Sequence, residues 1–203
     1  ERNFDNTWYL KASYVWSHLR GNSEGGVDSS NGQADTGTTE LYDYPEIMAG
    51  TNGYLPNDRK HTFKVYGAWQ ISDEWMVGAN GVFQTGRPEN CYGLNPIDGS
   101  VNGGYGSPSY LYCDGMVVKR GSAGRTPSYW NIDLNASYKP MWAKGLTLSA
   151  NVFNVFNKQH TTTINETGED DSGNSLAGSS YKIPTGFQSP RYVQLSAEYD
   201  FSL

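Results

Sequence analysis

The sequence predicts an all-β fold, a segment of an antiparallel transmembrane β-barrel with about six strands. Six stretches alternate apolar and polar side chains residue by residue, which gives each strand two different faces. The connections between these stretches are in turn very long and very short, as in outer-membrane barrels, whose two rims carry unequal loops. A content of 14% aromatic residues, 24 Gly and 18% charged residues suits turn-rich β structure.

The expected strands follow one another along the chain with apolar side chains at every second position. We expect the first at residues 8–16, the second at 63–71, the third at 75–83 and the fourth at 130–138. The fifth begins at residue 146, and the sixth covers residues 193–203. In the fourth, Ile132 and Leu134 alternate with Asn131 and Asp133. A helix does not produce this pattern, because its faces repeat every three to four residues.

The connections predict three hairpins with long extracellular loops. Residues 20–58, 86–126 and 158–189 are long, polar and rich in Gly, Ser, Asn and Asp, whereas residues 72–74 and 139–145 make short turns. Compact soluble domains rarely contain several structureless loops of this length. In an outer-membrane barrel the short turns face the periplasm and the long loops face outside.

Six strands cannot be a complete barrel. A sheet in hydrocarbon must close, because each unpaired backbone group there costs several kcal/mol, and bacterial barrels start at about eight strands. We therefore expect residues 1–203 to be part of a larger barrel domain. No apolar run approaches the ~20 residues of a transmembrane helix, and no signal peptide begins the chain. The net charge of -6 gives no support to nucleic-acid binding.

Charged and aromatic residues are expected at the two rims. Extending the outward-facing positions of three strands to their outer ends reaches Arg59, Arg87 and Arg191, which would face lipopolysaccharide phosphates. Pairing with loop carboxylates, or snorkelling, is the alternative for these arginines. The periplasmic aromatic belt would consist of Trp8, Trp69, Trp75 and Trp142.

The loops carry the remaining candidate sites. Cys91 and Cys113, the two cysteines, predict a disulfide that closes the second loop, since no ligands for a metal lie near them. Clustered carboxylates in the third loop make a weak candidate for a divalent-cation site, and otherwise keep the loop solvated. They are Glu166, Glu169, Asp170 and Asp171. Catalysis finds no support, because there is no nucleophile motif and the three histidines are far apart in the sequence.

Several motifs resemble those of a known family. The stretch Asn151-Val-Phe-Asn-Val-Phe-Asn157 resembles the Asn-x-Phe-Asn signature near the C-terminus of TonB-dependent outer-membrane receptors. Similarity to the C-terminal part of the Oar-like branch of this family is carried by Leu55-Pro-Asn-Asp-Arg-Lys-His61, Thr85-Gly-Arg-Pro88, Ser189-Pro-Arg-Tyr-Val-Gln-Leu195 and Tyr199-Asp-Phe201. Their order and spacing cover most of the chain from about Leu55 onward.

The resemblance implies a 22-stranded barrel in the outer membrane of a Gram-negative bacterium. It also implies a plug domain, which is not part of residues 1–203, and a TonB coupling protein in the periplasm. The polar inward positions would then contact the plug, and the barrel would move a bulky polar ligand such as a peptide or glycan. Ligand contacts are expected from loop tyrosines that could stack on a sugar or peptide: Tyr42, Tyr44, Tyr54, Tyr92, Tyr105, Tyr110 and Tyr112.

Two other functions stay open at this point. A secreted or surface β-sandwich, binding glycans or acting in adhesion, would pack its apolar faces on a second sheet and stay soluble without detergent. A passive porin would have the same barrel without a plug.

Overall fold

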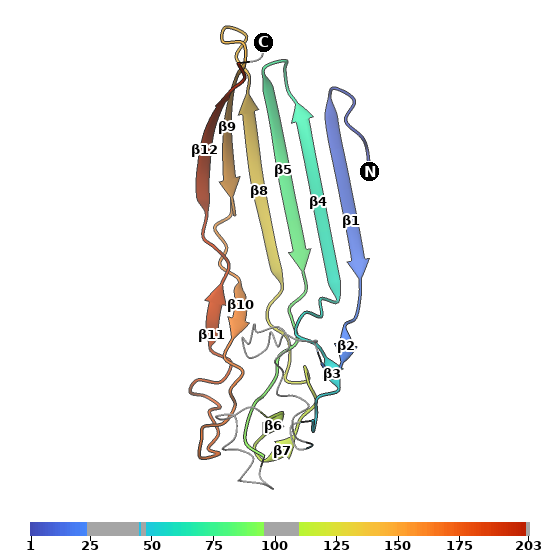
Figure 1. The fold of residues 1–203 in the computed structure, drawn as a ribbon, viewed down its shortest axis with the longest axis vertical. Coiled ribbons are helices and arrows are strands. Elements are labelled where there is room, and N and C mark those ends of the chain that lie inside the picture. Colours follow the sequence, from blue (N-terminus) through green and yellow to red (C-terminus); the bar gives the residue numbers. More distant parts are fainter. Residues whose placement is uncertain (24–44, 46–47, 96–109, 202–203) are drawn as a thin grey trace.

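One six-stranded antiparallel sheet dominates the structure, a computed structural model that describes the chain except for residues 24–44, 46–47, 96–109 and 202–203. Its order is β1-β4-β5-β8-β9-β12, so each strand pairs with the next long strand of the chain (Figure 1). The bounds are Trp8–Trp16 for β1, His61–Gln70 for β4, Trp75–Gln84 for β5, Tyr129–Tyr138 for β8, Leu146–Phe153 for β9 and Tyr192–Tyr199 for β12. The six expected strands are confirmed.

The register keeps apolar positions opposite apolar positions across the sheet. Phe63 of β4 lies opposite Phe83 of β5, and Leu134 of β8 lies opposite Val152 of β9. A slip by one residue would turn a whole strand's apolar side chains to the other face. The sheet therefore has one apolar face and one polar face, as the alternation predicts.

The four tryptophans predicted for one rim lie at the same end of the sheet. Trp8 and Trp75 begin β1 and β5, Trp69 lies next to the end of β4, and Trp142 lies in the connection between β8 and β9. The last three are well exposed, at 55% for Trp69, 44% for Trp75 and 78% for Trp142. An aromatic row at the rim of an apolar band is what a membrane interface favours.

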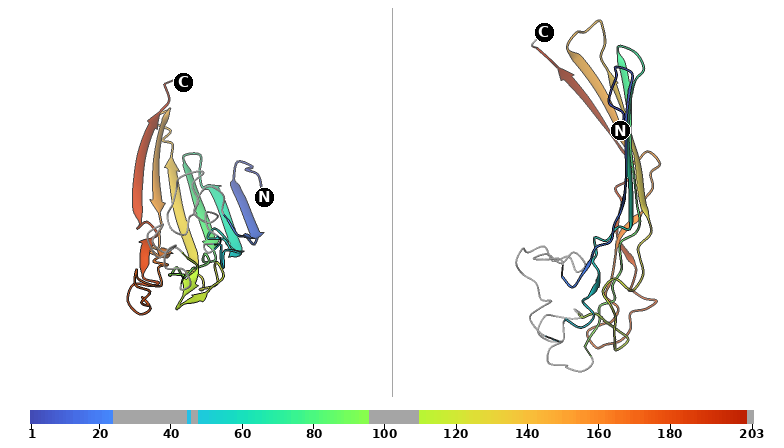
Figure 2. Two further views of the ribbon diagram at one scale, coloured as in Figure 1. Left: turned by 60° about the horizontal axis from the view of Figure 1, so that its bottom comes forward. Right: turned by 90° about the vertical axis from the view of Figure 1, so that its right-hand side faces the viewer.

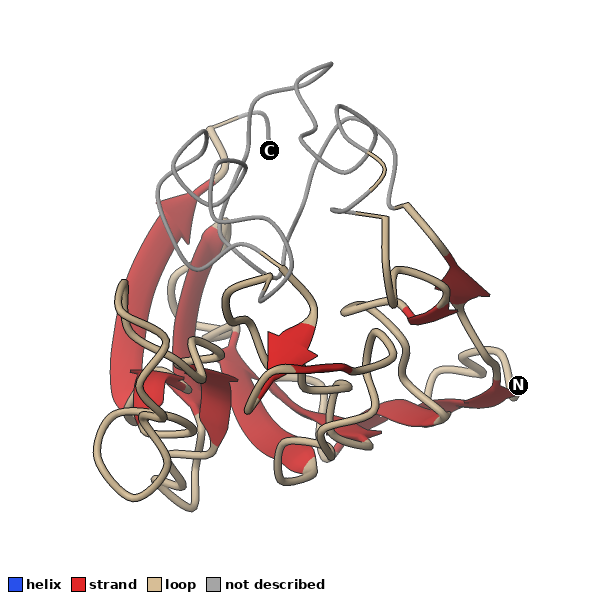
Figure 3. Ribbon diagram, turned by 90° about the horizontal axis from the view of Figure 1, so that it is seen from below, coloured by secondary structure: helices blue, strands red, loops and turns tan. Residues whose placement is uncertain are grey.

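The sheet is curved and open (Figures 2 and 3). Its edges are β1 and β12, and neither pairs with another long strand among the described residues. Edge groups of β1 are satisfied at one point, where Arg2 and Leu10 exchange two backbone hydrogen bonds of 2.8 and 3.2 Å. The rest of both edges presents the unpaired backbone groups that only a larger barrel could satisfy in a membrane.

The long connections contain short strands that the sequence pattern does not predict. These are β2 (Arg20–Gly21) with β3 (Gly53–Tyr54), β6 (Tyr112–Cys113) with β7 (Met116–Val117), and β10 (Thr161–Ile164) with β11 (Pro184–Phe187). The last expected strand is also shorter than predicted: β12 ends at Tyr199, and residues 202–203 lie outside the described part. No helix in the described part is long and apolar enough to cross a membrane.

The buried core lies in the loops rather than in the sheet. Tyr110, Leu111 and Cys91 are no more than 2% exposed, and Leu55 is 5% exposed. By contrast, Leu195 on the apolar face of β12 is 77% exposed. An apolar face that no other element of the protein covers is expected of a barrel wall that lies against lipid.

Candidate functional site at the loop end of the sheet

The first and second long connections meet at Asp58, which is 1% exposed. The Leu19 backbone N–H donates to its Oδ1 over 2.5 Å, Arg125 forms an ion pair with its Oδ2, and His18 Nδ1 lies 3.6 Å from Oδ1. Burial alone would raise the pKa of Asp58, but the hydrogen bonds from Arg125 and Leu19 outweigh it, so its pKa is lowered. Asp58 is therefore an ionised anchor between these loops.

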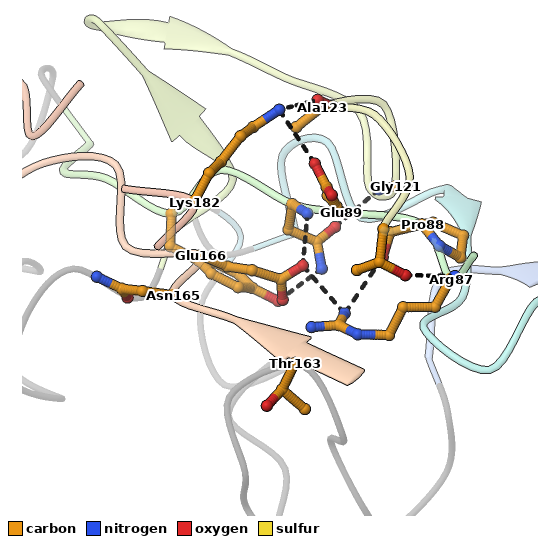
Figure 4. A network of polar contacts seen from close by, with 12 residues as sticks. Arg87, Pro88, Glu89, Gly121, Ala123, Thr163, Asn165, Glu166 and Lys182 are labelled. Atoms are coloured by element: carbon orange, nitrogen blue, oxygen red, sulfur yellow. Dashed lines mark hydrogen bonds and ion pairs between the residues drawn. The ribbon is translucent and has the colours of Figure 1, made fainter. Parts of the chain in front are cut away.

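The second and third connections meet at a buried ion pair (Figure 4). Arg87 Nη1 lies 3.1 Å from Glu166 Oε1, and the two residues are 8% and 4% exposed. The Asn90 backbone N–H also donates to Glu166 Oε1, over 2.9 Å. Desolvation by burial raises the pKa of Glu166, and the contacts with Arg87 and Asn90 offset this only in part.

Lysine and tyrosine side chains from the third connection extend this contact. Lys182 Nζ forms an ion pair of 3.0 Å with Glu89 and donates to the Ala123 carbonyl. Tyr181 donates its hydroxyl to the Asn90 carbonyl over 3.1 Å. Burial, followed by the charges of Glu89 and Glu166, raises the pKa of Tyr181 to about 12. The hydroxyl thus stays protonated and able to donate.

A disulfide joins Cys91 and Cys113, as predicted, with a Cα–Cα distance of 5.8 Å. The third connection packs directly on it: a Cβ at Gly168 would lie 2.2 Å from Cys91 Sγ. Beside it, Glu169 accepts hydrogen bonds from the backbone N–H groups of Leu94 and Gly115, over 2.8 and 3.3 Å. Only a glycine allows the backbone this close to the disulfide.

Arg120 links the second connection to the first and is 1% exposed. Its backbone N–H donates to the Gly50 carbonyl over 2.7 Å, its carbonyl accepts from Tyr54 N, and its Nε donates to the Thr51 carbonyl. Together with Asp58 and Glu166, it makes the three loops one packed layer across the end of the sheet.

The signature around Asn151–Asn157 controls how the chain leaves β9. Asn154 is 4% exposed and has a positive φ of 50°, a backbone region that asparagine tolerates well. Its Nδ2 donates to the Lys158 and Ser189 carbonyls, each over 2.8 Å, and its backbone N–H donates to Asp133 Oδ1. Asn157 Oδ1 accepts from Arg191 N, just before β12 begins. The motif therefore fastens both ends of the third loop to the sheet.

Comparison with known proteins agrees with this geometry. The chain is 28% identical over 239 aligned residues to the TonB-dependent transporter Oar of Myxococcus xanthus. The alignment covers 98% of the chain but 21% of that transporter, so the chain spans about one fifth of this curated relative. No protein-family model matches the chain.

Solved structures of outer-membrane receptors share the fold. The closed form of Fiu, the ferric-catecholate import receptor of E. coli K12, matches with a TM-score of 0.51 at 18% identity, over 97% of this chain and 19% of Fiu. PiuA, a siderophore receptor of Acinetobacter baumannii, matches with a TM-score of 0.50 at 14% identity, over 96% of this chain and 20% of PiuA. The resemblance to TonB-dependent receptors is confirmed.

The matched proteins share a localisation and a class. TonB-dependent receptors are outer-membrane proteins of Gram-negative bacteria, and the proteins matched are transporters and receptors rather than enzymes. The sandwich alternative finds no support among the described residues, where the other sheets have two strands each and offer no second large sheet for the six-stranded one. The long connections thus correspond to loops of the barrel fold that these solved receptors share.

The arginines of the expected outer ring have three different environments. Arg87 does not face lipid: β5 ends at Gln84, so the alternation no longer applies at Arg87, and its side chain turns inward to Glu166. This corrects the prediction in favour of carboxylate pairing. Arg59 is half-buried and donates to the Thr85 carbonyl, whereas Arg191 is exposed.

The loop tyrosines are mainly packing residues in this structure. Tyr92, Tyr110 and Tyr112 are at most 8% exposed, so their rings are not accessible to a ligand, and their predicted ligand role is corrected. Tyr54 is half-buried and lies under the guanidinium groups of Arg20 and Arg125, with carbon-to-ring distances of 4.8 and 5.4 Å. The remaining candidates, Tyr42, Tyr44 and Tyr105, lie outside the described residues.

The acidic residues of the third loop act separately. Glu166 binds Arg87, Glu169 binds backbone N–H groups, and Asp170 accepts from the N–H groups of Ser172 and Asn174. Asp171 is exposed. Within the described residues no group of three or more His, Cys, Asp or Glu side chains could hold a metal ion, so the cation site stays a prediction without a described cluster.

Proposed function

We propose that residues 1–203 are the C-terminal barrel portion of a TonB-dependent receptor that moves a bulky polar ligand, such as a peptide or glycan, across the outer membrane. The single observation that supports this most is the open, curved sheet with one bare apolar face, joined to a match with Oar over 98% of the chain. Such a sheet needs further strands on both edges, and a receptor barrel supplies them.

The remaining parts of the receptor are its proposed partners. Other barrel strands would pair with β1 and β12, a plug would fill the lumen against the polar face, and the TonB coupling protein would act from the periplasmic side. Arg191, exposed at the outer end of β12, and Arg59 are the proposed contacts with lipopolysaccharide phosphates.

Uptake measurements in the native bacterium test this function. Cells that lack the receptor gene are expected to lose uptake of one ligand from a panel of labelled peptides and glycans. Cells that lack the coupling protein are expected to lose uptake of the same ligand. If uptake needs the receptor but not the coupling protein, the receptor is a passive porin and the proposal is wrong.

A further inference from the structure

A polar pocket lies on the polar face of the sheet, at its loop end, between β8, β9 and the segment that leads into β12. Its volume is about 370 Å³, and its lining includes Asp133, Gln188 and Tyr129. This volume lies at the low end of the range for small-molecule pockets, about 300–1,000 Å³, and leaves room for a Lys or Arg side chain. None of the residues predicted for ligand binding lines it.

Asp133 determines which groups donate and which accept in the hydrogen bonds of this pocket. An ionised carboxylate only accepts, so Asn131 must present its Nδ2 to Asp133 Oδ1, over 2.7 Å. Asn131 Oδ1 then accepts from Gln188 Nε2 over 3.0 Å. Gln188 is 8% exposed, and its Oε1 is buried without a hydrogen-bond partner. This series of hydrogen bonds therefore ends at the carbonyl oxygen of Gln188, which still needs a donor.

The donors of Asn154 beside the pocket are already in use. Both hydrogens of Asn154 Nδ2 go to the Lys158 and Ser189 carbonyls, and its backbone N–H goes to Asp133. Asp133 itself accepts from neutral groups and forms no ion pair with any described residue. The pocket thus offers a negative charge and a buried acceptor without a partner, beside hydroxyl groups that can donate or accept.

Aromatic rings complete the lining. Phe153 and Tyr192 stack with ring centroids 4.5 Å apart and an interplanar angle of 17°, and Tyr129 and Phe187 also line the pocket. Aromatic faces attract ammonium and guanidinium groups, most strongly where water is excluded. Aromatic faces, a carboxylate and an unpaired carbonyl oxygen are the surroundings that such a cation prefers.

We propose that this pocket binds the ammonium or guanidinium group of a basic peptide. The inference rests on the proposed uptake function and narrows its ligand to peptides with a Lys or Arg side chain. Gln188 Oε1 would accept a hydrogen bond from the cation, and Asp133 would supply the opposite charge.

Titration calorimetry on the purified full-length receptor in detergent tests the pocket directly. The probes are N-acetyl-arginine amide and its neutral analogue N-acetyl-citrulline amide. Wild-type receptor is expected to bind the arginine probe at least about tenfold more tightly, because charge-assisted hydrogen bonds are roughly twice as strong as neutral ones. Asp133→Asn is expected to remove most of this preference, and Gln188→Met to weaken binding of the arginine probe.

Asp133→Asn removes the charge at a small structural cost, because only the long contact of Asn80 Nδ2 with Oδ2, at 3.5 Å, loses its acceptor. Both short hydrogen bonds to Asp133, from Asn131 and from Asn154 N, go to Oδ1, which an asparagine retains. The matched control is Glu198→Gln on β12, which removes one charge from the same polar face outside the pocket. The control is expected to bind both probes like the wild type.

Three results would overturn the proposal. They are equal affinity for both probes, no binding of either probe because a basic side chain of the plug already fills the pocket, and equal losses in Asp133→Asn and Glu198→Gln. None of these three results depends on the TonB coupling protein. A receptor that fails here but still shows coupled uptake keeps the proposed function and loses only the basic-peptide pocket.

Discussion

The buried ion pair between Arg87 and Glu166 gives the most quantitative prediction. Replacing Arg87 by Met removes the cation and leaves Glu166, which is 4% exposed, with the Asn90 backbone N–H as donor to Oε1 and no partner for Oε2. Breaking a buried pair in this way typically costs about 3–5 kcal/mol. That cost would increase local opening of the loop layer by about 100- to 5,000-fold.

Hydrogen–deuterium exchange of the full-length receptor measures this opening at single segments. The useful reporters are the amides of Tyr92, which donates to the Glu166 carbonyl, and Gly168, which donates to the Tyr92 carbonyl. We expect both to lose protection in Arg87→Met, while amides in the middle of β5 and β8 keep theirs. Arg191→Met is the control, since it removes an exposed arginine from the same end of the sheet.

The double variant Arg87→Met/Glu166→Met tests whether an uncompensated buried charge causes the loss of protection. If the damage comes from an uncompensated buried charge, removing both partners should restore much of the protection, because an apolar replacement for a buried pair is often neutral or stabilising. Protection in Arg87→Met that equals the wild type would refute the reasoning, since it would mean that Glu166 is solvated or protonated at no cost.

Three further predictions concern the pH response, the disulfide and the membrane face. Because the pKa of Glu166 is raised above its ordinary value of 4.5, its contribution to stability is fully present below that value and is lost as pH rises through the raised pKa. Loop protection should therefore fall with rising pH in this window, and Glu166→Gln should flatten the profile in exchange measurements. Asp58, whose pKa is lowered below 3.8, acts in the opposite sense only under more acidic conditions. Reduction of the bond between Cys91 and Cys113, 22 residues apart, should destabilise the second loop by about 3 kcal/mol and expose it to protease without unfolding the sheet; unchanged digestion would contradict this. Leu195→Arg should destabilise the receptor in lipid by about 2–4 kcal/mol in urea unfolding, whereas Ser196→Arg, one residue along on the polar face, should cost far less.

The six long strands were predictable because one constraint acts on every residue in them. A wall between lipid and a wet lumen must alternate its side chains, and the register then follows from keeping apolar residues opposite one another, as Phe63 and Phe83 do. The short strands of the loops were not predictable. A two-residue strand such as β3 has no period to detect, and its hydrogen bond to Arg120 depends on the packing of another loop.

The candidate site was predicted only in part, for a related reason. The disulfide could be foreseen because the chain has two cysteines. The partners of Asp58 could not, because Arg125 lies 67 residues away in sequence. For Arg87 the alternation was extended past Gln84, where the strand has already ended and nothing fixes the direction of a side chain. Loop contacts depend on tertiary packing, which local pattern does not record.

The motifs that resembled the receptor family have a common structural use. Asp58 belongs to the motif Leu55–His61, Arg87 to Thr85–Pro88 and Asn154 to Asn151–Asn157. Each of these three residues is at most 8% exposed and binds a segment distant in sequence. Buried anchors of this kind hold the loops in place, and this role does not require them to contact the ligand. Ligand choice can therefore be tested at residues outside these motifs. Asp133 and Gln188 lie outside the motifs, although motif residues such as Asn154 also line the basic-peptide pocket. Asp133→Asn tests the charge and keeps the acceptor for the Asn154 backbone N–H.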